Sequence, residues 1–260
     1  MKMKKIIALL LLSSLVLSCV KEDEGPQTMF MGSQLNIGNG KVWTFVELDA
    51  TSLEPTKMGV QFDATALENL PPPHNDGHTH GNEYLMDLPE VPDVDLSLYK
   101  NISFDWQAVG HFPPGTYDIS HFDIHFYMIS VAERALIVPP LDSDKFMAPM
   151  NPEHLPETYI EIPGGEVGQG NHMISSSFPE INGTGIFTHT FIYGKYEAQI
   201  NFLEPMVTLD YLLSKTNITT PIGQPQEWQQ AGYYPNEYTI HYDEATAIYT
   251  ISLDQLTWSN

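Results

Sequence analysis

The stretch HFDIHFYMIS, residues 121–130, places ionisable side chains at every second position. Alternate residues of a β-strand share a face, so His121, Asp123, His125 and Tyr127 would lie together, with apolar residues on the other face. Imidazole and carboxylate groups are the usual ligands of Zn²⁺, and they also transfer protons. The pattern therefore indicates a metal site, a proton-transfer site, or a half-buried polar ladder whose groups satisfy one another.

The spacing of these residues limits how they can act. A strand rise of ~3.3 Å per residue separates the backbones of His121 and His125 by ~13 Å, whereas a Zn–N bond is only ~2.0–2.1 Å long. Asp123 would therefore join one histidine as a ligand, or accept hydrogen bonds from both and fix their tautomers. A helix would bring both histidines together, but the alternation of aromatic residues favours a strand.

A metal site needs further ligands, and three candidates are His172, His189 and Glu204. His189 shares its predicted strand face with aromatic residues, which is also typical of a core histidine. Glu204 ends an apolar row, where an unpaired carboxylate is costly; alternatively, it caps a helix that begins near Pro205. His172 lies in the glycine-rich stretch GQGNHMISSS and is either brought to the site by a flexible backbone or a plain loop residue.

A second polar cluster, HNDGHTHGNE, contains His74, Asp76, His78, His80 and Glu83. Its glycine and asparagine content favours an exposed loop with weak affinity for metals. The glycines of IPGGEVGQG lack the strand-to-helix context and the lysine of a phosphate-binding loop, so no nucleotide cofactor is expected.

The elements that must position these residues are mostly strands. Aromatic and β-branched residues dominate KVWTFVELDA, MGVQFDA, EYLMDLP, NISFDWQAVG, SHFDIHFYMIS, TGIFTHTFIYG, YEAQINFLEP, EYTIHYD and AIYTISLDQL. ATALENL can form a helical turn, and SVAERALIV and EPMVTLDYLLSK are the helix candidates. We expect a mainly β fold, with residues 34–260 forming a single β-sandwich or barrel-like domain with one or two short helices.

The amino-terminal residues are typical of an exported lipoprotein. A basic start and an apolar run predict a signal peptide over residues 1–18, followed by the chain's one cysteine, Cys19. LVLSC resembles a lipobox, which would make Cys19 the lipid-bearing residue, although a buried or free thiol is the alternative. VKEDEGPQ resembles a surface-export tag of lipoproteins in Bacteroidota-like outer membranes. We therefore expect an acidic, flexible tether over residues 19–33 and a surface-exposed outer-membrane lipoprotein.

Charge narrows the choice of partners. Cleavage after residue 18 removes Lys2, Lys4 and Lys5, so 8 basic residues face 33 acidic ones and the formal charge changes from −22 to −25. Because a polyanion would be repelled, nucleic acid is not expected as a partner. The membrane, through the anchor at Cys19, is the expected one.

Three segments together resemble one family: GHFPPGTYDISHFDIHFYMIS, PEHLPETYIEIPGG and FTHTFIYGKYEAQINFLEPMVTLDYLL. The family is an uncharacterised group of secreted bacterial β-rich proteins, first defined as a domain of unknown function from a Thermus protein. The resemblance covers roughly residues 38–215. It implies a mainly β domain able to form homo-oligomers, and it implies no known reaction.

By motif match, the resemblance points to His111, His121, Asp123 and His125 in the first segment and to Glu204 in the third. The family has a His-Trp pair where this chain has His172 followed by Met173, so the possible ligand is kept while its packing changes. The HNDGHTH loop has no counterpart in the family pattern.

These observations favour a lipid-anchored binding or assembly module with a divalent metal, such as Zn²⁺, held by His121, Asp123, His125 and a ligand from another segment. One alternative is a metal-dependent hydrolase, in which Glu204 or Asp123 is the base. Another is a structural, oligomeric component of the cell surface. The sequence leans away from an enzyme and names neither a substrate nor a metal.

Overall fold

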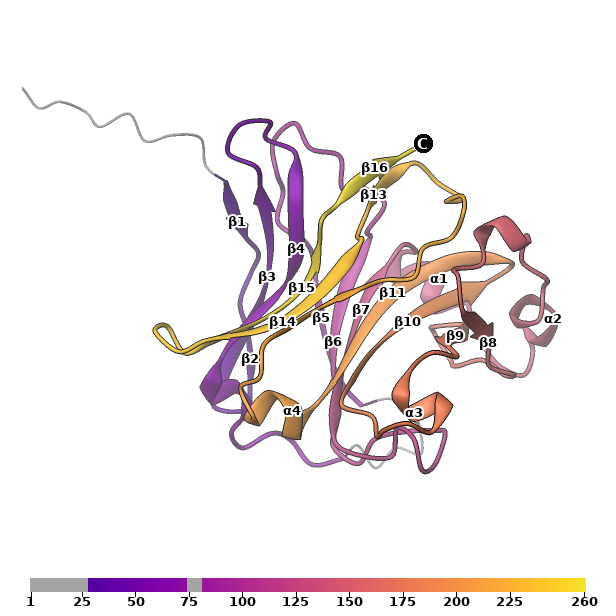
Figure 1. Cartoon of the computed structure of the whole chain (residues 1–260), viewed down its shortest axis with the longest axis horizontal. Helices are drawn as coiled ribbons and strands as arrows, with labels where there is room; N and C mark the ends of the chain where they lie inside the picture. Colours follow the sequence, from indigo (N-terminus) through magenta and orange to yellow (C-terminus); the bar gives the residue numbers. More distant parts are fainter. Residues whose placement is uncertain (1–27, 74–80) are drawn as a thin grey trace, which may run out of the picture.

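The computed structural model describes residues 28–73 and 81–260 of the chain. They form a mainly β, sandwich-like domain of antiparallel sheets without a closed barrel, which confirms the predicted fold class. Figure 1 shows two large sheets side by side, with loops and short helices beyond the second.

The first sheet, named here the terminal sheet, contains strands from both ends of the described chain. Its strand order is β1 (Met29–Met31), β3 (Gly40–Leu48), β4 (Pro55–Asp63), β15 (Ile248–Asp254), β14 (Glu237–Asp243) and β12 (Ile218–Pro221), and β2 (Leu35–Ile37) pairs with β3. The segments KVWTFVELDA and MGVQFDA, both predicted as strands, form β3 and β4, which pair antiparallel.

The second sheet, named the central sheet, carries most of the candidate residues. Its strand order is β5 (Asn82–Met86), β6 (Asn101–Gln107), β7 (His121–Tyr127), β11 (Gln199–Thr208), β10 (His189–Tyr196), β9 (Asn171–Ser175) and β8 (Tyr159–Glu161). A small third sheet joins β13 (Gly232–Tyr234) to β16 (Thr257–Ser259).

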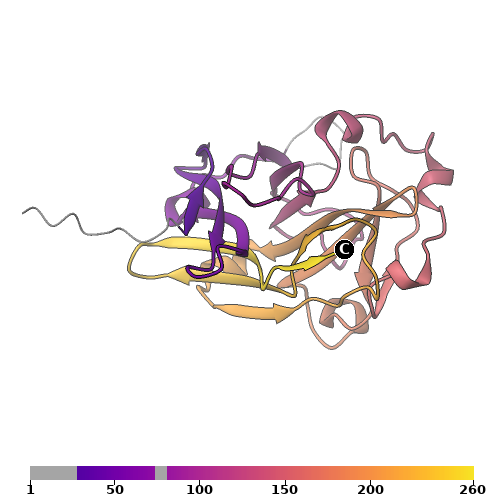
Figure 2. The same ribbon diagram turned by 90° about the horizontal axis from the view of Figure 1, so that it is seen from above.

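The two large sheets pack face to face through aromatic side chains. The ring of Phe62 on β4 lies 5.4 Å from the ring of Phe104 on β6 and 6.3 Å from that of Phe122 on β7, between centroids. Figure 2 shows the same layers from above. Because one face of the central sheet is used in this core, its other face is left for the polar side chains.

Helices are short and lie outside the sheets. They are α1 (Val131–Arg134), α2 (Ser143–Phe146), α3 (Pro179–Asn182) and α4 (Leu209–Leu213), with 3₁₀ turns η1 (Ala64–Leu67) and η2 (Pro152–His154). Residues 28–73 and 81–260 thus contain two more α-helices than the upper number expected. None of the helices in the described ranges has the length and apolarity needed to span a bilayer.

The helix boundaries correct one expectation about Glu204. Strand β11 continues through Pro205 to Thr208, and the helix α4 begins only at Leu209. The side chain of Thr208 accepts a hydrogen bond from the backbone N–H of Tyr211 and so caps this helix. Glu204 is therefore not a helix cap. In contrast, α1 begins at Val131 within the predicted segment SVAERALIV, behind a capping box formed by Ser130 and Glu133.

The predicted amino-terminal regions are only partly described. The signal peptide over 1–18, Cys19 and the first part of the tether lie outside the described residues, as do His74, Asp76, His78 and His80. Residues 28–33, which the sequence assigns to the tether, include β1, and β1 pairs with β3. The sheet therefore begins before residue 34.

Candidate metal centre

The polar face of the central sheet is built by alternation along three neighbouring strands. β7 is extended and lies between β6 and β11, which confirms the strand predicted for HFDIHFY. On β6, Asp105 is opposite Asp123 and Ser103 is opposite His125. On β11, Phe202 is opposite Tyr127 and Met206 is opposite Asp123. Glu204 lies midway between these two pairs, so the register places it across from His125. Ionisable groups of distant segments are thus brought onto one face.

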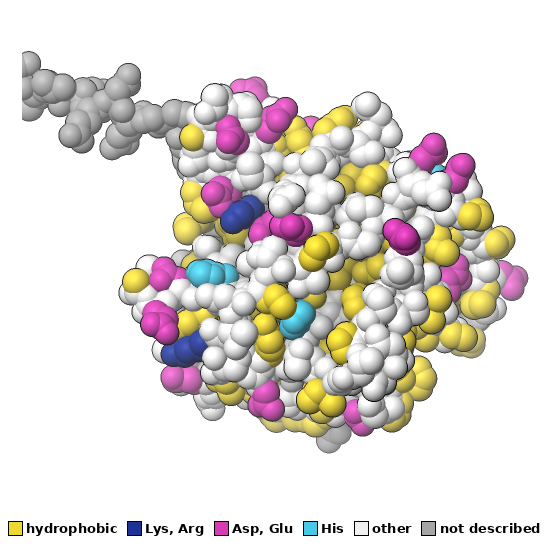
Figure 3. Space-filling model, viewed as in Figure 1, with side chains coloured by type: hydrophobic (Ala, Val, Ile, Leu, Met, Phe, Trp, Pro, Cys, Tyr) yellow, Lys and Arg dark blue, Asp and Glu magenta, His cyan; other side chains and the backbone are white. Residues whose placement is uncertain are grey.

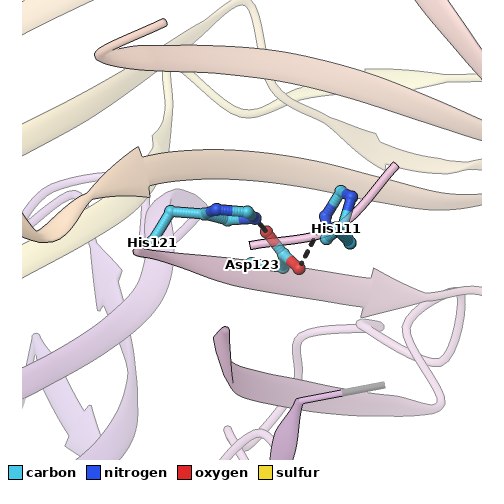
Figure 4. A group of neighbouring side chains, drawn as sticks. All are labelled: His111, His121 and Asp123. Carbon is cyan, nitrogen blue, oxygen red and sulfur yellow. Dashed lines mark ion pairs between the residues drawn. The ribbon is translucent and has the colours of Figure 1, made fainter. Parts of the chain in front are cut away.

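The first group of candidate ligands consists of His111, His121 and Asp123 (Figure 4). The Nε2 atom of His121 is 2.9 Å from Oδ1 of Asp123, and Nε2 of His111 is 3.3 Å from Oδ2. The Asp123 carboxylate therefore lies between two imidazoles, one from its own strand and one from the loop before it. Gln107 on β6 donates a hydrogen bond of 2.9 Å to Oδ2.

Both imidazoles of this group are held by the backbone on their other nitrogen. Nδ1 of His121 is 2.6 Å from the carbonyl oxygen of Ile119, and Nδ1 of His111 is 2.8 Å from that of Phe112. A carbonyl can only accept, so Nδ1 carries the proton and donates in each case. In a neutral imidazole this leaves the Nε2 lone pair directed at Asp123, which is the arrangement typical of metal-ligating histidine.

The second group consists of His125, His172 and Glu204. Nε2 of His125 is 3.4 Å from Oε1 of Glu204, and Nε2 of His172 is 3.8 Å from Oε2. Nδ1 of His125 lies 3.0 Å from Oδ2 of Asp105, an oxygen that also accepts a 2.6 Å hydrogen bond from the Ser103 hydroxyl. His125 is thus oriented by one carboxylate and faces another.

A glycine makes room for the second group. A Cβ atom at Gly194 on β10 would collide with the ring of Phe202 on β11, so this ring lies across the sheet only because residue 194 has no side chain. The Phe202 ring centroid is 5.0 Å from the His125 ring and 5.3 Å from the His172 ring. Phe202 therefore packs against both imidazoles.

Burial and neighbouring charges shift the pKa of the three acids in different directions. Burial itself would raise the pKa of Asp123, but the charges of His121 and His111 outweigh it and hold that pKa well below its usual value. Burial, Asp123 and Asp105 raise the pKa of Glu204 well above its usual value. Burial and the nearby Glu83 raise the pKa of Asp105 in the same way. A cation among these groups would favour the charged form of Glu204 and Asp105.

A cavity of about 80 Å³ gives access to both groups. Its wall includes His111 and Asp123 of the first group and His172 and Glu204 of the second, together with residues 162–166. The apolar residues Tyr117, Phe187, Ile192 and Met206 cover the same face of the sheet. A small ligand entering the cavity could reach both groups.

The surface seen in Figure 3 carries acidic side chains over many elements, while the visible Lys and Arg side chains form no patch on the described part of this face. The acidic balance of the sequence is therefore spread over this surface, and the cavity lies within an anionic molecule that attracts cations.

The structure unites five of the six predicted metal ligands: His121, Asp123, His125, His172 and Glu204. His189 is the exception. Its Nδ1 is 2.8 Å from the hydroxyl of Tyr238, and its ring packs against Tyr211. These contacts lie on the opposite face, because β10 turns Ile192 toward the cavity and Phe191 toward the core. The structure does not bring His189 to the other five residues, and its contacts are those of a core histidine.

Sequence reasoning missed Asp105 and Gln107, and it reached His111 only through the family resemblance. The signal was present in NISFDWQ, where Ser103, Asp105 and Gln107 alternate with apolar residues as in HFDIHFY. His172 is on strand β9 and not in a loop, and its neighbour Met173 is buried in the core. Alternation thus explains why His172 reaches the site while Met173 does not.

Comparison with protein-family models, with curated proteins and with solved structures finds no match to the chain. The resemblance to the Thermus-derived family stays a prediction. The fold and the site define the protein as a β-sandwich with a buried histidine and carboxylate face.

Proposed function

We propose that the protein is a binding module for a divalent transition-metal ion such as Zn²⁺, held on the polar face of the central sheet. The observation that carries the proposal is the position of the Asp123 carboxylate between the Nε2 atoms of His111 and His121. Both imidazoles donate a hydrogen bond from Nδ1 to a backbone carbonyl, which leaves each Nε2 free to bind a metal. Two nitrogen donors and one oxygen donor then converge within 4.8 Å of one another, which is the donor set of many zinc sites.

A proton is the competing occupant of this position. If one imidazole is doubly protonated, it forms an ion pair with Asp123 and needs no metal. However, His121 Nε2 and Asp123 Oδ1 are both buried and, at 2.9 Å, form no well-directed hydrogen bond with each other or with any other atom of residues 28–73 and 81–260. With the proton on Nδ1, the Nε2 lone pair and the carboxylate oxygen would repel each other at this distance, and a shared cation would remove the repulsion.

Thermal denaturation of the chelator-treated protein tests the proposal. An ion that binds the native state stabilises it by ~2.7 kcal/mol at 100 times the dissociation constant, which for a domain of this size raises Tm by about 5–10 °C. Asp123→Asn should reduce the rise with added Zn²⁺. Asp254→Asn is the matched control, because Asp254 is also a buried carboxylate, on β15 of the terminal sheet. No rise in the unmodified protein would refute metal binding.

A metal-dependent hydrolase is the second candidate, favoured by the cavity that borders both histidine groups. In this case the ion would activate a water molecule and the Glu204 carboxylate would accept its proton. Zinc-loaded protein should then hydrolyse a chromogenic ester, and Glu204→Gln should lose the activity while a metal ion remains bound. Equal rates for the loaded and the chelated protein would exclude this candidate.

The proposed location is the surface of an outer membrane, reached through a lipid on Cys19. It is supported by the apolar run, the cysteine that ends it and the acidic residues that follow. Partition into detergent that is lost in Cys19→Ala would support the anchor, and unchanged partition would refute it. The predicted homo-oligomer is tested by light scattering.

A further inference from the structure

We infer that the polar face of the central sheet binds two divalent cations side by side, the second one held by His125, His172 and Glu204. This inference rests on the proposed function and extends it from one ion to two. The first ion would use His111, His121 and Asp123, and the two sets have no residue in common.

The backbone geometry separates the two sets. His121 and His125 are four residues apart on the same strand face, a distance of ~13 Å along β7. Ligand bonds to zinc are ~2.0–2.2 Å long, so an ion bound between His121 and His111 is too far from His125 to include it. One ion therefore cannot satisfy both sets.

The buried state of Glu204 is an independent indication of a second ligand. Glu204 is 2% exposed, and its Oε2 atom forms no hydrogen bond with any described residue. This oxygen faces His172 at 3.8 Å, which is longer than a hydrogen bond and leaves space for an ion between the two atoms. A buried carboxylate oxygen without a partner is costly, and a bound cation removes the cost.

Asp105 completes the second set as a positioning residue. Its carboxylate is 3.0 Å from Nδ1 of His125, on the side of the ring away from Glu204. A carboxylate on the distal nitrogen of a metal-bound histidine orients the ring and increases its basicity. The first set uses backbone carbonyls for the same purpose, so each ion has oriented imidazoles of its own.

The donor atoms define the class of metal. Each set supplies two imidazole nitrogens and one carboxylate oxygen, a combination that suits Zn²⁺ and Fe²⁺. Ca²⁺ and Mg²⁺ take oxygen ligands and are not expected. Two divalent ions carry four positive charges against the three carboxylates of Asp105, Asp123 and Glu204, so the like-charge repulsion among these buried acids would be relieved.

Metal analysis of single variants tests the inference. Chelated protein is reloaded with excess ZnCl₂, desalted and measured for zinc per folded chain. We expect two ions in the unmodified protein, one in His111→Ala, one in His172→Ala and none in the double variant. His111 and His172 are partly exposed, so their replacement by alanine should not prevent folding. Circular dichroism checks that the variants are folded. His189→Ala, on the opposite face, should keep two ions.

The outcomes separate the inference from the proposed function. The unmodified protein could bind only one ion, which is kept in His172→Ala and lost in His111→Ala. This result would overturn the second site and leave the proposed function intact. Loss of all zinc from folded His172→Ala also overturns it, because the ligands would then form one shared centre. No zinc in the unmodified protein overturns both. Anomalous scattering at the zinc edge from a crystal should show two peaks over β7.

Discussion

The two faces of β7 are equally buried but chemically opposite. Phe122, Ile124 and Phe126 are fully buried against the terminal sheet, and His121 and its polar neighbours are at most 2% exposed beneath the loops. Burying an apolar side chain stabilises the fold by ~1.5–3 kcal/mol. Burying a charged group is unfavourable unless a partner compensates. The apolar face therefore explains stability, whereas the polar face is best explained by a ligand.

The largest expected effect is on the apolar face. Phe122→Ala should lower the free energy of unfolding by about 3–5 kcal/mol, because the Phe122 ring packs 4.8 Å from those of both Phe104 and Trp106. Denaturant titration of the chelated protein measures this loss. The zinc content of the folded fraction should not change.

Phe122→Leu is the matched control and should lose much less stability, because it keeps most of the buried apolar volume. If Phe122→Ala lowered zinc binding in fully folded protein, the two faces of β7 would not be independent.

On the polar face, the next largest effect is expected from Asp105→Asn. Replacing a carboxylate that orients a metal-bound histidine typically weakens metal binding 10–100-fold, or ~1.4–2.7 kcal/mol. Zinc titration followed by calorimetry should show this loss for one of the two ions. Ser103→Ala removes one hydrogen bond to the same carboxylate and should have a weaker effect in the same direction. Unchanged affinity in Asp105→Asn would mean that His125 is not a ligand.

The difference between the faces also determines what the sequence could predict. The alternation in HFDIHFY predicted both faces correctly, because side-chain direction in a strand is a local property. The same rule applied to NISFDWQ would have found Asp105. His189 could not be placed in this way, since both faces of the buried strand β10 carry apolar residues and only the packing of β10 decides which one faces the terminal sheet.

The pairing of distant segments was also beyond local rules. His111 reaches Asp123 from a loop, and His172 on β9 reaches Glu204 on β11 across the intervening strand β10. Their contacts depend on strand order and register, and neither is contained in any single segment. The fold class needed only composition and alternation, so it could be predicted, whereas the ligand sets needed the tertiary structure.

A smaller effect is expected from pH on the metal-free protein. The raised pKa of Glu204 means that the folded state favours the protonated carboxyl. Its contribution to stability is present below the unfolded value of about 4.5 and is lost as pH rises through the folded value. One such group changes the free energy of unfolding by at most ~1.4 kcal/mol per pH unit. Denaturation in chelator at several pH values should show this fall, and Glu204→Gln should reduce it.

Asp123 has the opposite sign and does not obscure this test. Its lowered pKa gives a contribution that is present above the usual aspartate value and is lost only in stronger acid. Zinc should counteract the fall seen with Glu204, because a bound cation favours the ionised carboxylate. If the free energy of unfolding of Glu204→Gln changed with pH as steeply as that of the unmodified protein, groups other than Glu204 would cause the fall.

The smallest effect is expected from His189→Ala. This variant loses the hydrogen bond between His189 and Tyr238, at a cost of ~0.5–1.5 kcal/mol, and some packing against Tyr211. Zinc content and zinc affinity should both stay unchanged, since the side chain lies on the other face of the central sheet. A histidine whose removal weakens the fold but not metal binding would show that the site depends on which face a residue occupies. Lower zinc content in folded His189→Ala would instead mean that the metal is bound outside the polar face.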